Sequence, residues 1–343
     1  MSPFRKQVLH MPFRPARKAL PQVPSFDFTG GDLTILFSNP EDPETPTSTR
    51  ACSNCLSIAS PVWEKFLHLP WATDSTPPVT QVDFTSDDLA TITLLLRIAH
   101  LQFQNIPKKL SYPRLLQMAI ACDKYSCAGL VAPWLESWLS DERTSSMEDG
   151  KEGWLFIAWV FGRHSIFEQL ANKLVLEVKT NDEGEFLTKN GEVMPEPMPH
   201  NILESILEVR AETIDRLFFI PFTWLKNFEQ SPTPLCSRTY DREACDSIMY
   251  GSVARAIQHA SLWPLTTSDK IHLSIAEFVN VLRSVRVYPL HEPRGKSMEW
   301  SHVNCKTFNM HFGIATILRE IGNPVMDCHR VHMKQQRGEV EEN

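Results

Sequence analysis

Glycine is scarce in this sequence, with 13 glycines among 343 residues. Loops that bind phosphates or dinucleotides need glycines where the backbone approaches the ligand closely, so few such loops can form here. The sequence also has no P-loop, dinucleotide glycine motif, hydrolase nucleophile elbow or His-Glu-x-x-His motif. We therefore expect a protein that is not an enzyme; an enzyme with its site in the C-terminal half is the alternative.

Long apolar runs are missing as well. The best run, residues 154–162, is followed at once by Arg163 and His164, and it is much shorter than the roughly 18 apolar residues of a membrane helix. The eight cysteines do not form the dense framework of a small secreted domain. The N-terminus also lacks the apolar core of a signal peptide. We expect no membrane association, and a cytoplasmic or nuclear location.

Basic residues are concentrated at the N-terminus. Of the formal net charge of −7, the first 26 residues contribute +5 and the remainder therefore −12. Because nucleic-acid platforms usually present a basic folded face, other proteins are the expected partners of the folded body, and nucleic acid is not. Residues 1–24 are predicted to be a disordered basic arm; a nuclear signal and a transit peptide are the alternatives.

The apolar pattern predicts an α+β chain with strands early and helices late. Residues 26–28 and 33–37 alternate around a Gly-Gly-Asp turn and predict a hairpin. Further strands are expected just before Leu56 and over 79–84, and Ser86 is the expected N-cap of the next helix. Asn190-Gly191 is a candidate hairpin turn. Helical spacing recurs over residues 153–180, 201–228, 241–262, 271–287 and 306–321.

These patterns suggest a domain division. Residues 25–140 form the expected first domain, and the charged stretch 141–152 is the expected linker. A helical domain is expected over 153–322, followed by a polar tail over 323–343.

Four segments of the first domain occur in the order typical of one family. They are "GDLTILF", "CLSIASPVW", "LRIAHLQFQNIPKKLS" and "ACDKYSCAGLVAPWLESWL". The block 31–139 resembles a BTB/POZ domain, specifically the divergent form found in filamentous fungi. The resemblance implies a small α/β domain, with a few strands capped by a helical cluster, that serves protein association. The helical remainder resembles the extension that these fungal proteins carry.

The sequence departs from the family at two places. BTB domains often carry His followed by a basic residue where this chain has Cys52 and Ser53, and the basic residue faces an Asp matching Asp32 in a dimer-associated pocket. Arg50 is a candidate substitute for that basic residue, so the usual dimer is in doubt and self-association stays open. The segment 68–76, "HLPWATDST", lacks the Glu of a cullin-binding motif. We expect an interaction protein; the alternatives are a cullin ubiquitin-ligase adaptor and a transcription-linked regulatory scaffold.

Two cysteine pairs could be read as sites. Cys52-x-x-Cys55 begins an expected helix, whose dipole would lower a thiol pKa, but no thioredoxin-like pattern precedes it. Cys122 and Cys127 lie on apolar stripes, and on one continuous helix they would point about 140° apart. A break at Ser126 would let them approach, without further ligands nearby in sequence. We predict that both pairs are packing residues.

A dispersed set of cysteine and histidine residues in the C-terminal half is a candidate zinc site. Zinc takes four tetrahedral ligands, and Cys236-x8-Cys245 with His302-x2-Cys305 could supply two from each side; His311 is a fifth candidate. The spacings match no known zinc finger. Scattered core and polar residues are the alternative interpretation, and no other cofactor is expected.

Overall fold

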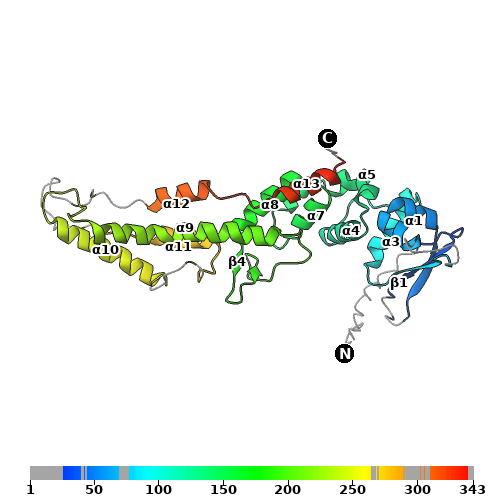
Figure 1. The fold of residues 1–343 in the computed structure, drawn as a ribbon, viewed down its shortest axis with the longest axis horizontal. Coiled ribbons are helices and arrows are strands. Elements are labelled where there is room, and N and C mark those ends of the chain that lie inside the picture. Colours follow the sequence, from blue (N-terminus) through cyan, green and yellow to red (C-terminus); the bar gives the residue numbers. More distant parts are fainter. Residues whose placement is uncertain are drawn as a thin grey trace, which may run out of the picture. The chain divides into compact units, whose positions relative to one another are not determined.

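The computed structural model describes residues 26–39, 42, 45–68, 77–263, 268, 270–288, 290, 302, 305 and 310–338. The expected basic arm, residues 1–24, therefore lies outside the described residues. The chain divides into two compact units, Met1–Ile106 and Pro107–Asn343. The expected α+β class, mostly helical, is confirmed (Figure 1).

A three-stranded sheet forms the base of the first unit. β1 (Leu33–Phe37) lies in the centre, antiparallel to β2 (Thr47–Ala51) and parallel to β3 (Gln81–Phe84). Leu33 pairs with Ala51, and Ile35 pairs with Val82. The period of two in β1 buries one face of the strand against the core.

The expected hairpin between residues 26–28 and 33–37 is wrong, because the antiparallel partner of β1 is β2. Residues 26–28 form no strand. The Phe28 N–H donates to the Arg50 carbonyl at 3.0 Å, and the rings of Phe26 and Phe28 lie 4.9 and 5.0 Å from that of His100. The alternation in this segment thus reflects aromatic packing on His100, not pairing with β1.

Helices cover the sheet of the first unit. α1 (Ser53–Ala59) and α2 (Pro61–Leu67) form the connection from β2 to β3, and the Ser60 hydroxyl accepts the first amides of α2. α3 (Leu89–Ala99) is buried along most of its length and contacts α1. Asp88, not the expected Ser86, is its N-cap and accepts the Thr91 N–H at 2.8 Å. A short 3-10 helix, η1 (Phe103–Asn105), follows.

The second unit consists mainly of helices, and a helix lies in each of the five predicted helical segments; residues 306–309 of the last segment lie outside the described residues. The first contains α7 (Trp154–Val160) and α8 (His164–Glu177), which separate at Gly162, where φ is +65°. α9 (Ile202–Gln230) is the longest helix and contacts α8, α10, α11 and α12 (Figure 1). The last three are α10 (Arg242–His259), α11 (Ile275–Ser284) and α12 (Met310–Arg319).

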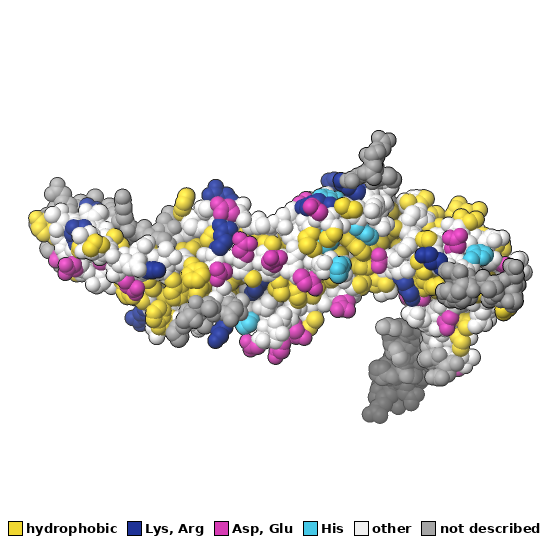
Figure 2. Space-filling model, in the orientation of Figure 1, with side chains coloured by type: hydrophobic (Ala, Val, Ile, Leu, Met, Phe, Trp, Pro, Cys, Tyr) yellow, Lys and Arg dark blue, Asp and Glu magenta, His cyan; other side chains and the backbone are white. Residues whose placement is uncertain are grey.

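A small hairpin interrupts the helices. β4 (Lys179–Thr180) pairs with β5 (Phe186–Leu187), and the chain then turns at the expected Asn190-Gly191, where Gly191 has a φ of +82°. The Thr188 N–H donates to the Glu192 carbonyl across this turn. Figure 2 shows acidic side chains gathered at the loop between β4 and β5, which contains Asp182, Glu183 and Glu185.

The boundary between the units differs from the expected linker over 141–152. That stretch lies inside the second unit, where α6 (Glu142–Ser145) buries Glu142 against the Arg163 guanidinium, with Nε at 2.8 Å. α4 (Tyr112–Lys124) and α5 (Ala128–Trp138) also belong to this unit. α4 contacts α7, and the ring of Tyr112 stacks on Trp154. This packing places the boundary after Ile106.

The expectation of a frayed tail over 323–343 is wrong for its central part. Residues Asp327–Gln336 form α13, which contacts α7. His329 and Met333 are buried, and the His332 ring stacks on Trp159 at 3.8 Å. The polar composition concealed this helix because much of its packing comes from histidine rings. Among the described residues, no helix has the length and apolarity to cross a membrane.

Candidate metal centre

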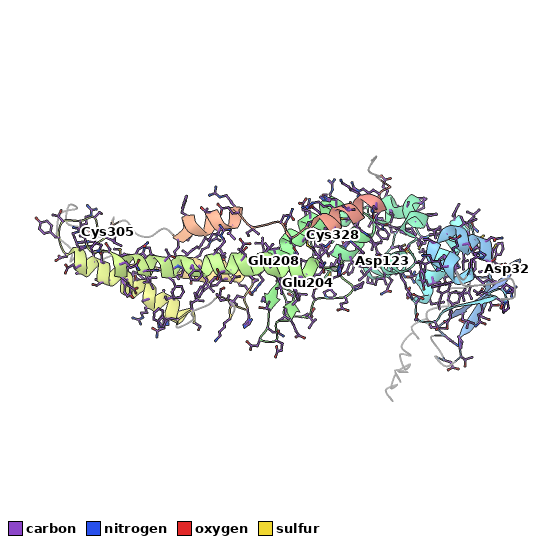
Figure 3. All side chains as sticks on the ribbon, viewed as in Figure 1. Asp32, Asp123, Glu204, Glu208, Cys305 and Cys328 are labelled. Atoms are coloured by element: carbon purple, nitrogen blue, oxygen red, sulfur yellow. The ribbon has the colours of Figure 1, made fainter. Side chains whose placement is uncertain are left out.

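Four of the five candidate ligands lie together in the second unit. Cys236 is in the loop between α9 and α10, Cys245 is in α10, and His302 and Cys305 lie between α11 and α12. All four are buried, with at most 4% of any residue exposed. Figure 3 labels Cys305 at the end of the unit where α9 is followed by α10.

The four ligand atoms lie close enough together to bind one tetrahedral ion. The Cys236 and Cys305 Sγ atoms are 3.3 Å apart, and those of Cys245 and Cys305 are 3.8 Å apart. His302 Nδ1 lies 3.4 Å from both the Cys236 and the Cys305 Sγ, and all four atoms fall within 4.8 Å of one another. Zn–S bonds of about 2.3 Å in a tetrahedron place the sulfurs roughly 3.8 Å apart.

The loop that carries Cys236 is bound to α10, the helix that carries Cys245. The Asp246 carboxylate accepts the Cys236 N–H at 2.9 Å and that of the preceding residue at 2.6 Å. The Arg242 guanidinium donates to the Cys236 carbonyl at 2.8 Å. These charged bonds hold the backbone of one ligand over the first turns of the helix that supplies another.

The other two ligands form a second local pair. The Cys305 N–H donates to the His302 carbonyl at 3.0 Å, and the side chains of both residues reach the cluster. The two halves of the cluster thus come from segments more than 50 residues apart in the chain.

Burial raises the pKa of two thiols of the cluster. It is the main cause that raises the pKa of Cys305 to about 12, and the neighbouring thiols of Cys236 and Cys245 add to the effect. Burial likewise raises the pKa of Cys245. Since a metal binds the thiolate, any ion at this cluster has to displace protons from the sulfurs.

His311, the fifth candidate, is not part of the cluster. It lies on α12 and is exposed, whereas Met310 and Ile314 of the same helix are buried. The inward face of α12 is therefore apolar, and His311 points to solvent. Sequence spacing alone could not exclude it, because this depends on which face of α12 is covered.

Neither of the other cysteine pairs has the features of a site. Burial and a hydrogen bond with Cys52 raise the pKa of Cys55, the opposite of what a redox thiol needs. The helix does break at Ser126, where φ is +49°, and the thiols of Cys122 and Cys127 form a hydrogen bond that raises the pKa of Cys122. In the part of the chain that the structure describes, this pair has no third ligand.

Asp32 has a different partner from the one expected. Its carboxylate accepts the Ser53 N–H at 2.8 Å and the Ser53 hydroxyl at 2.6 Å, and these bonds lower the pKa of Asp32. Arg50 instead donates to the Gly31 carbonyl, with Nη2 at 2.5 Å. Asp32 therefore binds the first amide of α1, and Arg50 makes only a minor electrostatic contribution to it.

A pocket of about 490 Å³ lies next to the cluster, between the end of α9 and α10. Three carboxylates, of Glu229, Glu243 and Asp246, are among its lining residues, but none of the four cluster residues is. An ion held by all four would have no open coordination position, which is typical of a structural site and not of a catalytic one.

Comparison of the chain with protein-family models, curated proteins and solved structures gave no match.

Proposed function

We propose that this chain is a non-catalytic protein-interaction protein whose first unit acts as a BTB/POZ-like association module. The observation that carries the proposal is the tip formed by Leu101 and Phe103, after α3. Leu101 is 73% exposed and Phe103 is 50% exposed. Leu101 also has a φ of +61°, a left-handed conformation that costs a residue with a Cβ about 1–2 kcal/mol.

A strained backbone that presents apolar side chains to solvent needs an explanation, because neither feature stabilises the unit by itself. Such strain is found at binding sites, and adjacent exposed apolar side chains are typical of protein docking surfaces. The tip lies within "LRIAHLQFQNIPKKLS", one of the segments that carries the BTB/POZ resemblance. The acidic body supports a protein partner over nucleic acid.

The proposal is tested with the full chain as bait in its native cell, followed by mass spectrometry, and by light scattering of the purified chain. We expect a reproducible partner or a self-associated species, weakened at least about tenfold, or 1.4 kcal/mol, by Leu101→Asp. Leu176→Asp is the matched control, since Leu176 is an exposed leucine of the second unit. A monomer with no reproducible partner would contradict the proposal.

The identity of the partner separates the alternatives. A cullin N-terminal domain that binds the purified chain would support the ubiquitin-ligase adaptor. Recovery of other proteins without a cullin would support a different interaction role for the same tip.

A further inference from the structure

We propose that Cys236, Cys245, His302 and Cys305 together bind one structural zinc ion. This site lies in the second unit and is independent of the association tip in the first. Four donors, drawn from three separate segments, coincide there in a buried volume that matches a single ion. Each donor is a residue type that zinc prefers.

The donor set favours zinc over other ions. Three thiols and one imidazole form a soft set, which excludes magnesium and calcium because these ions bind oxygen ligands. A bridged iron–sulfur cluster needs room for several atoms between its cysteines, whereas the Cys236, Cys245 and Cys305 sulfurs approach one another to 3.3 and 3.8 Å. One tetrahedral ion accounts for all four residues.

A disulfide between Cys236 and Cys305 is the main rival. A sulfur separation of 3.3 Å is well above the length of an S–S bond, about 2.05 Å. A disulfide would also leave Cys245 and His302 without a reason to converge at the same point. Zinc uses both, since His302 Nδ1 faces the Cys236 and Cys305 sulfurs at equal distances of 3.4 Å.

Zinc binding forms four bonds and removes three protons. The thiols of Cys236, Cys245 and Cys305 lose their protons to solvent, neutral His302 binds through Nδ1, and no electrons are transferred. The bound ion joins the α9–α10 loop and α10 to the segment between α11 and α12. The zinc therefore holds His302 and Cys305 against the α9–α10 loop and α10, which is a structural role.

The test begins with metal analysis of the full-length chain, expressed with zinc and purified under reducing conditions without chelator. We expect one zinc per chain in the wild type and less than about a tenth of that in Cys305→Ser. Two controls should keep the full zinc content: His311→Ala removes the exposed histidine of α12, and Cys328→Ser removes an exposed cysteine of α13.

Cobalt exchange covers the case in which Cys305→Ser does not fold. Wild-type protein with Co²⁺ in place of zinc should show the intense visible absorption of a tetrahedral site and the near-ultraviolet bands of thiolate ligation. Three results would each overturn the proposal: wild-type protein without zinc, a folded Cys305→Ser protein with full zinc content, or a Cys236–Cys305 disulfide in the native chain.

Discussion

Replacing Arg210 with methionine should destabilise the helical unit by about 2–4 kcal/mol. Arg210 lies on α9 and is 5% exposed. Its Nε donates to the Val178 carbonyl at 3.2 Å, and its Nη2 donates to those of Ile271 and Leu273 at 2.8 and 2.7 Å. One side chain thus connects α9 with the end of α8 and with the segment that precedes α11.

The magnitude follows from what the three carbonyls lose. Methionine keeps an apolar stem but donates no hydrogen bond. Val178 and Ile271 are at most 5% exposed, so water cannot replace the lost donor at their carbonyls. Each carbonyl left without a hydrogen bond costs about 1–3 kcal/mol of stability. Leu273 is 40% exposed, so its carbonyl is rehydrated. Burial also lowers the pKa of Arg210, which shows that the charged guanidinium is desolvated. Its removal recovers part of this desolvation free energy, so the expected net loss of stability is about 2–4 kcal/mol.

The assay is urea unfolding of the full chain, monitored by far-ultraviolet circular dichroism, which is dominated by the helical unit. Arg216→Met is the matched control on the same helix. Arg216 pairs with Glu320 at the surface, with 35% and 56% of the two side chains exposed, so the control should lose at most about 1 kcal/mol. Equal losses in the two variants would refute the reasoning from buried carbonyls.

The first unit gives two further predictions. Burial lowers the pKa of His100 below 6.5, so the unfolded chain binds more protons as pH falls from 6.5 towards the folded value, and stability decreases over that window; the protection factors of the β1 amides, with the intrinsic pH dependence of exchange divided out, should fall there, and less so in His100→Gln. Gly31→Ala should cost about 1–3 kcal/mol, because its Cβ would overlap the Ala51 carbonyl. The control is Gly129→Ala, on α5 of the second unit, which has no atom near the new methyl and should leave the stability in urea unfolding unchanged or raise it by about 0.5–1 kcal/mol.

Local patterns in the sequence predicted where helices and strands occur better than which elements they pack against or pair with. The helical spacing over 201–228 corresponds to α9, Ile202–Gln230. A helix with one buried face has an apolar period of 3.6 residues, whichever element covers that face. The partner of β1 could not be found in this way. The alternation at 26–28 fits a strand, whereas 47–51, Thr-Ser-Thr-Arg-Ala, shows no apolar alternation. Only the distant His100 decides that residues 26–28 pack by their rings.

The prediction of the domain boundary was wrong for a related reason. A charged stretch is typical of a linker, and residues 141–152 have this composition. Composition does not reveal that Glu142 meets Arg163 or that Tyr112 stacks on Trp154. Each is a contact between segments separated by more than 20 residues in the chain, and such contacts leave no periodic signal.

The zinc candidates were predictable to the extent that ligands come in local pairs. Cys236 with Cys245 and His302 with Cys305 could be singled out as two local pairs, although their spacings match no known zinc finger. The approach of one pair to the other across more than 50 residues could not be predicted. Residues 291–309 contain few apolar side chains in any helical period, so the sequence offers no pattern from which the position of His302 and Cys305 could be predicted. The proposed zinc ion gives the physical reason for their approach to Cys236 and Cys245, because one tetrahedral ion needs all four side chains at a single point.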